Sequence, residues 1–299
     1  MFKGSITALI TPFKKGEIDW KAFDNLVEWQ IEQGTHGLVP CGTTGESPTL
    51  TYDEDMAVVE RCVKIANKRV PVIAGTGSNA THEAITLTQH AKDVGADGAL
   101  IVTPYYNKPT QDGLYAHYRK IHDEVAIPII IYNIPGRCVI DMTVETMAKL
   151  AKLPNIVGVK DAAADLARPL ETRMAIGPDF CQLSGDDITA AAFLAQGGVG
   201  CISVVSNVAP AQCARLQEAW MEGDLETFSE LRDLLLPLAK TLFCESNPAP
   251  VKYAASTLGL CSDEVRLPLV PASEKARKLV DAALEQTGLK GGRAKARRA

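Results

Sequence analysis

A lysine directly follows a short apolar run in this chain, Ile156-Val157-Gly158-Val159-Lys160. Such a run predicts a buried strand, which would place the Lys160 amine inside the protein or at the mouth of a cleft. Burial disfavours the charged ammonium and lowers its pKa, and a neutral amine attacks carbonyl carbons to give a Schiff base. The alternative is a lysine that ends a strand and extends its amine to water, and this stretch alone does not exclude it.

A second candidate is the turn Cys41-Gly42-Thr43-Thr44-Gly45-Glu46-Ser47, which also follows an apolar run. Its glycines allow close approach to the backbone, so free N–H groups and the hydroxyls of Thr43 and Thr44 can together hold a carboxylate. The alternative is an ordinary glycine turn in which Ser47 or Thr49 caps the next helix.

Tyrosines and an arginine follow two further apolar runs, as Thr103-Pro104-Tyr105-Tyr106-Asn107 and as Tyr132-Asn133-Ile134-Pro135-Gly136-Arg137. A tyrosine close to a lysine ammonium can act as general acid and base. The planar guanidinium of Arg137 suits a carboxylate. Tyr105 and Tyr106 either pack in their loop or take part in proton transfer.

The pair Asp186-Asp187 closes another run. Paired carboxylates can bind magnesium, but we favour a cap for a helix beginning at Ile188. The glycines of the segment 197–200 precede a strand, so we interpret them as a tight turn rather than as a phosphate site. No cysteine pair has zinc-ligand spacing, and we expect no metal.

Eight apolar, strand-length runs separated by helix-length segments must position these side chains. Most of the runs are apolar throughout, as expected for parallel strands covered on both faces. The predicted strands are 5–11, 37–41, 71–75, 98–103, 127–133, 156–160, 181–185 and 200–205, and the clearest helices between them are 19–33, 81–94, 144–152 and 187–195. Asp19 is expected to cap the first helix.

This repeat predicts an α/β fold, a (β/α)8 TIM barrel with a C-terminal helical extension. A doubly wound sheet is the competing architecture, but its glycine-rich turn is absent after the first strand. The remaining predicted helices are 211–221, 225–241, 250–258 and 273–286. We expect a catalytic barrel over residues 1–223, a helical region over 224–289 and a basic, disordered tail over 290–299.

In such barrels the reacting groups lie at the C-terminal ends of the strands. Thr43, Thr44, Tyr106, Tyr132, Arg137 and Lys160 would therefore meet at one end. The set contains a carbonyl nucleophile, hydroxyls that relay protons and an anchor for a carboxylate. This combination indicates a class I aldolase that acts on a 2-keto acid.

Composition restricts the remaining choices. A net charge of −5 gives no sign of nucleic-acid binding in the body of the chain. The eight cysteines are used as in a reducing compartment. We expect no signal peptide and no membrane span, because no apolar run approaches the roughly 20 residues that a span needs. The expected location is the cytoplasm.

The combination of Gly42-Thr43-Thr44-Gly45-Glu46, Tyr132-Asn133-Ile134-Pro135 and Val159-Lys160-Asp161 resembles the pyruvate-dependent aldolase superfamily of N-acetylneuraminate lyase and dihydrodipicolinate synthase. The resemblance covers residues 2–288. Thr103-Pro104-Tyr105-Tyr106-Asn107 and the arginine two residues after Pro135 favour the dihydrodipicolinate (4-hydroxy-tetrahydrodipicolinate) synthase family within it. The resemblance implies a lyase of lysine and diaminopimelate biosynthesis that condenses pyruvate with L-aspartate-4-semialdehyde without a cofactor.

The resemblance also implies roles for individual residues. Lys160 would form the Schiff base with pyruvate, and Thr43 and Thr44 would bind the pyruvate carboxylate. Tyr132, Thr43 and Tyr106 would relay protons, with Tyr106 supplied by the neighbouring subunit of a homotetramer that is a dimer of dimers. Arg137 would bind the carboxylate of the semialdehyde, and Gly185 and Ile202 would line the pocket through their backbone.

Many members of this family are inhibited by L-lysine at the dimer interface. The matching positions here are Ser47, Pro48, Tyr52, Asp55, Asn79, Glu83 and Tyr105. Tyr52 and Asp55 replace histidines of well-known members, and Pro48 replaces a smaller residue. We expect lysine to bind with altered affinity.

Two alternatives stay open at this point. One is a sibling aldolase that acts on N-acetylneuraminate or 2-keto-3-deoxygluconate, for which the carboxylate anchor Arg137 has no use. The other is a non-catalytic barrel that binds a metabolite or, through the basic tail, RNA.

Overall fold

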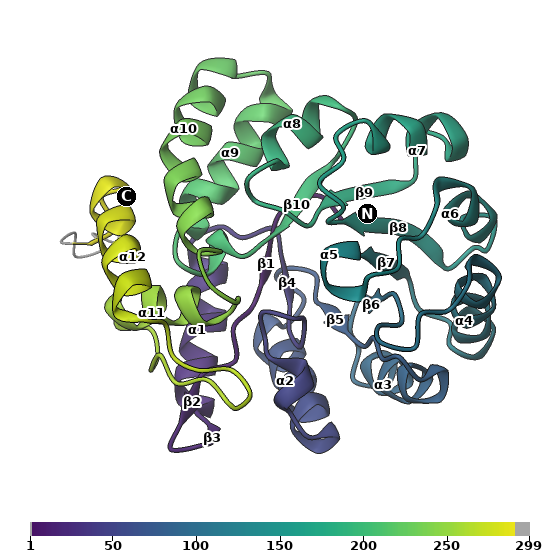
Figure 1. Cartoon of the computed structure of the whole chain (residues 1–299), viewed down its shortest axis with the longest axis horizontal. Helices are drawn as coiled ribbons and strands as arrows, with labels where there is room; N and C mark the ends of the chain where they lie inside the picture. Colours follow the sequence, from purple (N-terminus) through teal and green to yellow (C-terminus); the bar gives the residue numbers. More distant parts are fainter. Residues whose placement is uncertain (1, 291–299) are drawn as a thin grey trace.

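Eight parallel strands form the centre of the molecule in the computed structural model, which describes residues 2–290 (Figure 1). The order around the sheet is β4-β1-β10-β9-β8-β7-β6-β5. A bridge between Leu38 and Val72, with a hydrogen bond from the Leu38 N–H to the Pro71 carbonyl (3.0 Å), joins the two edges. The strands are β1 (Gly4–Ala8), β4 (Gly37–Val39), β5 (Ile73–Gly75), β6 (Gly98–Val102), β7 (Ile129–Asn133), β8 (Ile156–Asp161), β9 (Cys181–Ser184) and β10 (Gly200–Ser203). The predicted barrel is confirmed.

The strands are buried on both faces, which explains why their sequences are apolar throughout rather than alternating. Side chains that point inward form one apolar cluster, which includes Ile6, Val39, Leu183 and Ile202. Side chains that point outward pack under the helices in two further clusters. The interior is therefore a packed core, and the polar residues that lie within strands, such as Thr7 and Gln182, are buried as well.

A ring of helices covers the outside of the barrel (Figure 1). Asp19 caps the first helix as predicted, since its carboxylate accepts a hydrogen bond from the Ala22 N–H at 3.0 Å. The ring comprises α1 (Trp20–Glu32), α2 (Tyr52–Ala66), α3 (Thr81–Asp93), α4 (Gln111–Glu124), α6 (Val144–Leu150), α7 (Arg168–Ile176), α8 (Ala190–Ala195) and α9 (Pro210–Glu222). A hairpin of β2 (Phe13–Lys14) and β3 (Glu17–Ile18) and the short helices η1 (Ser47–Thr49), α5 (Pro135–Cys138) and η2 (Val205–Asn207) lie in the connections.

The alternative in which Ser47 or Thr49 caps the next helix is wrong, and so is the predicted start of the helix after β9. Thr51, rather than Ser47 or Thr49, caps α2, through a reciprocal pair of hydrogen bonds with Glu54. The helix after β9 begins at Ala190 instead of Ile188.

The carboxylates of Asp186 and Asp187 have different roles. Asp186 accepts from the Ile188 N–H (3.2 Å) and the Thr189 hydroxyl (2.7 Å), in the turn before α8. Asp187 is turned into the core, where it accepts from the Ser203 hydroxyl and from backbone N–H groups after β10. Asp187 therefore joins two strand ends and does not cap a helix.

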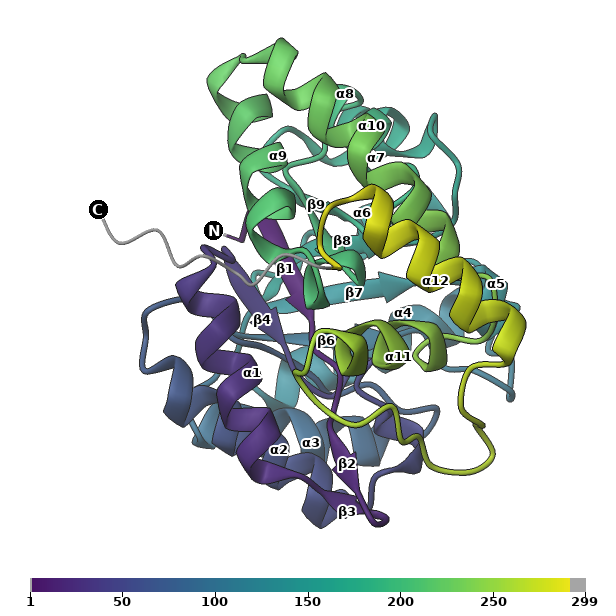
Figure 2. The ribbon, with the colours of Figure 1, turned by 90° about the vertical axis from the view of Figure 1, so that its left-hand side faces the viewer.

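Three helices follow the barrel: α10 (Leu225–Thr241), α11 (Ala249–Thr257) and α12 (Glu274–Gln286). Figure 2 shows α11 and α12 together on one side of the barrel, and α10 packs against both α9 and α12. Their apolar side chains join the cluster that contains barrel residues such as Leu9 and Phe13. The boundary proposed at residue 223 coincides with Gly223, whose left-handed backbone ends α9.

The predicted disordered tail lies outside the described residues except for Lys290, which forms an ion pair with Asp281 at 3.2 Å. Between residues 2 and 290, no helix has the length and apolar character to cross a membrane.

Candidate active site

Lys160 and Tyr132 lie side by side at the C-terminal ends of β8 and β7. They are register partners in the parallel sheet, and the Lys160 ammonium nitrogen lies 4.1 Å from the centroid of the Tyr132 ring. Both side chains are only 6% exposed. The structure thus brings the predicted nucleophile into contact with a group that can exchange protons with it.

Gly185 lies directly against the stem of Lys160. A Cβ atom at this position would lie 3.0 Å from Cε of Lys160 and 2.9 Å from Cβ of Ala162. Only glycine therefore leaves the lysine chain its present path. Ile202 is 1% exposed and belongs to the apolar cluster inside the barrel.

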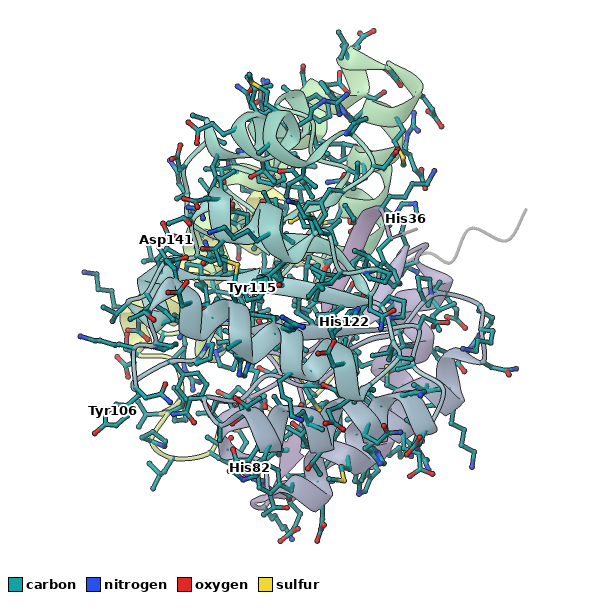
Figure 3. The ribbon with its side chains drawn as sticks, turned by 90° about the vertical axis from the view of Figure 1, so that its right-hand side faces the viewer. His36, His82, Tyr106, Tyr115, His122 and Asp141 are labelled. Atoms are coloured by element: carbon teal, nitrogen blue, oxygen red, sulfur yellow. The ribbon has the colours of Figure 1, made fainter. Side chains whose placement is uncertain are left out.

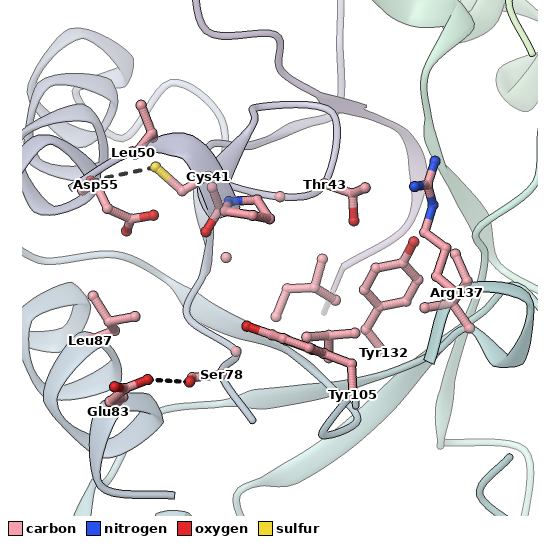
Figure 4. Close-up of a pocket in the computed structure, with 18 of the residues that line it drawn as sticks. Cys41, Thr43, Leu50, Asp55, Ser78, Glu83, Leu87, Tyr105, Tyr132 and Arg137 are labelled. Atoms are coloured by element: carbon pink, nitrogen blue, oxygen red, sulfur yellow. Dashed lines mark hydrogen bonds between the residues drawn. The ribbon is translucent and has the colours of Figure 1, made fainter. Parts of the chain in front are cut away.

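A cavity of about 400 Å³ opens above this end of the barrel (Figure 4). Thr43, Tyr132 and Arg137 line it, and Figure 4 shows the Tyr132 hydroxyl pointing toward the other two side chains. Arg137 comes from α5, the short helix after β7, and is exposed at the cavity. Lys160 is not one of the lining residues and lies beneath the cavity, beside the Tyr132 ring.

Thr44 is placed differently from Thr43. It is 3% exposed and does not line the cavity. Its hydroxyl oxygen accepts a hydrogen bond at 2.9 Å from the side-chain amide of Asn247, in the segment before α11. The two neighbouring threonines therefore have separate surroundings, one at the cavity and one against the C-terminal helices.

The two adjacent tyrosines, Tyr105 and Tyr106, lie in different surroundings. Tyr105 lines the cavity. Tyr106 has a left-handed backbone (φ 70°) and is 90% exposed, and Figure 3 places it at the edge of the molecule. Tyr106 is the one predicted catalytic residue that this chain does not bring to Lys160 and Tyr132.

Six of the seven residues predicted to hold lysine line the same cavity as Tyr132: Ser47, Pro48, Tyr52, Asp55, Glu83 and Tyr105. Asn79 does not line it; its backbone carbonyl accepts from the side chain of Asn107 at 2.8 Å. The cavity therefore extends from the strand ends to the surface between α2 and α3.

The acidic groups at this outer part have opposite pKa shifts. Asp55 is 4% exposed, and burial raises the pKa of its carboxyl to about 7. Hydrogen bonds from Ser78 and Tyr52 hold the pKa of Glu83 below its usual value, and the bond to Glu83 raises the pKa of Tyr52 to about 12. Near neutral pH this region therefore holds one fixed anion, Glu83, and one carboxyl that can change its charge.

The model of the dihydrodipicolinate synthetase family matches residues 1–287. The chain belongs to this family. Over 289 residues it is 66% identical to a 4-hydroxy-tetrahydrodipicolinate synthase of Rhodospirillum centenum, which covers 97% of this chain and 99% of the relative.

Solved structures of family members have the same fold. A chloride-inhibited dihydrodipicolinate synthase of Acinetobacter baumannii, complexed with pyruvate, has a TM-score of 0.94 at 46% identity and covers 97% of this chain and 100% of its own. The enzyme of Cyanidioschyzon merolae with lysine bound has a TM-score of 0.93 at 39% identity, with coverages of 96% and 99%.

One partly buried network beside the candidate active site was not predicted from the sequence. The Arg168 guanidinium, 7% exposed, lies 3.1 Å from the Asp161 carboxylate and 2.9 Å from the Asp141 carboxylate. Asp141 also accepts from the Asn133 side chain at 2.7 Å. The network ties the residue after Lys160 to the loop that follows Arg137, but its members are scattered between positions 133 and 168 and form no sequence motif.

Proposed function

We propose that this chain catalyses the condensation of pyruvate with L-aspartate-4-semialdehyde, the reaction that gives 4-hydroxy-tetrahydrodipicolinate. The observation that carries the proposal is the contact between Lys160 and Tyr132 beneath a cavity that also contains Thr43 and Arg137. A nucleophilic amine, a phenol and a guanidinium are the groups that this reaction requires. The names of the relatives and the pyruvate held by the A. baumannii protein support the same reaction.

The proposed mechanism begins when the Lys160 amine attacks the keto carbon of pyruvate and water leaves, which gives an imine. Loss of a methyl proton then gives an enamine, whose carbon attacks the aldehyde carbon of the semialdehyde. The amino group of the semialdehyde next attacks the imine carbon and releases Lys160 as the ring closes. The protein and the two substrates supply every reacting group in this scheme, and no cofactor takes part.

In this mechanism Tyr132 and Thr43 pass protons to and from the reacting carbonyl and amine. Thr43 and Thr44 bind the pyruvate carboxylate, while Gly185 and Ile202 bound the pocket around the imine. Arg137 holds the carboxylate of the semialdehyde. Its exposed place at the cavity suits the second substrate, which enters after pyruvate.

The proposal includes a homotetramer, a dimer of dimers, in which Tyr106 completes the site of a second copy. The 90% exposure of Tyr106 supports this, because a catalytic phenol left in water cannot reach its own Lys160. The outer part of the cavity would bind L-lysine, an effector that fits with the lysine bound to the C. merolae relative. If calorimetry detects no heat with millimolar lysine, the proposed effector site is wrong.

We also propose a cytoplasmic location.

The decisive experiment is to measure pyruvate consumption by the purified protein with L-aspartate-4-semialdehyde as the only aldehyde. We expect consumption that is abolished in Lys160→Ala. Borohydride trapping of pyruvate on Lys160 without consumption would keep the imine but assign another aldehyde. If the protein neither consumes pyruvate nor traps it on Lys160, the proposed function is refuted.

Arg137→Ala separates this reaction from those of sibling aldolases. We expect trapping of pyruvate to persist, while kcat/KM for the semialdehyde falls by about 100-fold, because a charge-assisted hydrogen bond is lost. Unchanged turnover in Arg137→Ala would contradict recognition of a carboxylate by this residue.

A further inference from the structure

The turn that carries Thr43 and Thr44 is held from outside the barrel. Asn247 donates a hydrogen bond from Nδ2 to the Thr44 hydroxyl oxygen at 2.9 Å, across 203 positions of sequence. Both residues are buried, with exposures of 5% and 3%. Asn247 Oδ1 is also buried and has no partner among the described residues, so the bond to Thr44 is the side-chain contact that orients this amide.

We propose that Asn247 is a positioning residue, which fixes the direction of the Thr44 hydroxyl so that its proton is donated toward the pyruvate carboxylate. The inference rests on the proposed function. A threonine hydroxyl has one proton to donate and lone pairs that accept. When the oxygen accepts from Asn247, the proton is directed elsewhere, and a carboxylate is an acceptor only. Asn247 thus directs the hydroxyl proton toward an acceptor such as a carboxylate without touching that acceptor.

A buried ion pair holds the same turn two residues further on. The Lys252 ammonium, on α11, lies 2.6 Å from Oε1 of Glu46, and both side chains are fully buried. The backbone N–H of Arg266 donates to the other carboxylate oxygen of Glu46 at 3.1 Å. The backbone of Glu46 is left-handed (φ 59°), a conformation that persists where surrounding contacts enforce it.

The ring of Phe13, in β2, is in contact with the side chains of both Lys252 and Arg266. Lys252 Nζ is 4.0 Å from its centroid, and the Arg266 guanidinium carbon is 4.4 Å away. Arg266 also donates to the Thr49 carbonyl at 3.1 Å. The C-terminal segment therefore holds the turn at Thr44, Glu46 and Thr49.

A buried ion pair is weak evidence for stability, because apolar side chains of similar volume often replace one without loss. The contribution of this ion pair is instead to position the turn, since it fixes where the Glu46 backbone lies. The C-terminal helices thus take part in substrate binding through Thr44, although none of their residues lines the cavity.

The test compares Asn247→Asp with Asn247→Ala. Aspartate has the shape of asparagine, but at pH 8 it only accepts, so the Thr44 hydroxyl would turn its proton toward Asp and away from pyruvate. We expect the half-saturating pyruvate concentration to rise about tenfold in Asn247→Ala and about 50-fold in Asn247→Asp, measured by borohydride trapping. The kcat at saturating pyruvate should change less.

A purely structural role predicts that Asp is no worse than Ala for pyruvate saturation once each variant's loss of stability, measured by thermal unfolding, is taken into account. That order, or wild-type pyruvate saturation in Asn247→Asp, overturns the inference. Trapping needs no semialdehyde, so the two proposals can be tested separately. The order of the Asn247 variants can contradict the inference while the wild-type protein still turns over the semialdehyde. Conversely, the wild-type protein can fail to turn over the semialdehyde while the order of the variants supports the inference. A wild-type protein that traps no pyruvate overturns both proposals.

The ion pair is tested by the double variant Glu46→Leu/Lys252→Met, which replaces it with apolar side chains. We expect a folded protein whose half-saturating pyruvate concentration is raised about tenfold. Tyr253→Phe is the matched control, because it removes a hydrogen bond between α11 and Asp281 on α12 without touching the turn. Equal pyruvate saturation in the double variant and the control would show that the pair does not position the turn.

Discussion

Lys160 and Tyr132 are register partners on adjacent parallel strands, and the lysine nitrogen lies 4.1 Å from the centre of the tyrosine ring. Since side chains paired in this way point to the same side of the sheet, both project into the end of the barrel. The contact uses the face of the ring, so the Tyr132 hydroxyl extends past the amine to the cavity that Thr43 and Arg137 line. This places a phenol between the nucleophile and the entrance for substrate.

The Tyr132→Phe variant tests the role of the Tyr132 hydroxyl apart from that of its ring. Phenylalanine keeps the ring beside Lys160, so we expect pyruvate to be trapped on the lysine as before. Loss of a general acid–base group should lower kcat by about 10²-fold or more. Steady-state kinetics with the semialdehyde checks this, with Tyr115→Phe on α4 as a control that should keep wild-type kcat. A kcat within a few-fold of wild type would remove Tyr132 from the proton relay.

Gly185→Ala should impair imine formation. The new methyl group would lie 3.0 Å from Cε of Lys160, so the lysine chain must move. We expect the rate of borohydride trapping to fall at least tenfold, a loss of about 1.4 kcal/mol in the transition state. Gly136→Ala is the matched control, because no atom lies within 4 Å of a Cβ there. Equal trapping rates in the two variants would contradict the contact.

Asp55 should make stability depend on pH. Its pKa is about 7 in the folded protein, against an ordinary value of 3.8. Between about pH 4 and 7 the unfolded chain therefore binds fewer protons at this site than the folded one, so the contribution of Asp55 to stability falls as pH rises through this window. Asp55→Asn removes this titration.

The Asp55→Asn variant should thus gain stability relative to wild type as pH rises, by at most about 4 kcal/mol above pH 7. Urea unfolding of both proteins at pH 4.5, 6 and 7.5 measures this difference. A difference that is constant across these pH values would mean that Asp55 has an ordinary pKa. The same titration predicts that a bound ammonium group is held more tightly above pH 7 than below it.

Tyr106 should act on a second copy of the chain. If it does, Tyr106→Phe and Lys160→Ala, each of low activity alone, should restore activity when mixed under conditions that exchange subunits. In each mixed pair one site then carries both changes and the other carries none, so about a quarter of all sites recover at equal mixing. No recovery, with mixed oligomers shown to form, would contradict a shared site.

Much of this fold could be predicted from local pattern. The eight strands and the cap at Asp19 follow from short-range preferences that the tertiary structure reinforces. The sequence predicted a helix cap at Asp187, but the actual role of Asp187 could not be predicted, because its partners, Ser203 and the N–H groups after β10, lie some 17 positions away. The β2–β3 hairpin was missed because each strand has only two residues.

The sequence by itself determined the barrel and the residues at its strand ends. All strands of a parallel barrel end on the same side, so the residues that close them gather there. Only the tertiary structure decided that Thr44 bonds to Asn247, that Lys252 pairs with Glu46 and that Tyr106 lies in water. These relationships join positions about 200 residues apart or depend on which way a loop turns. Packing of the C-terminal helices against the barrel sets them, and no local pattern encodes it.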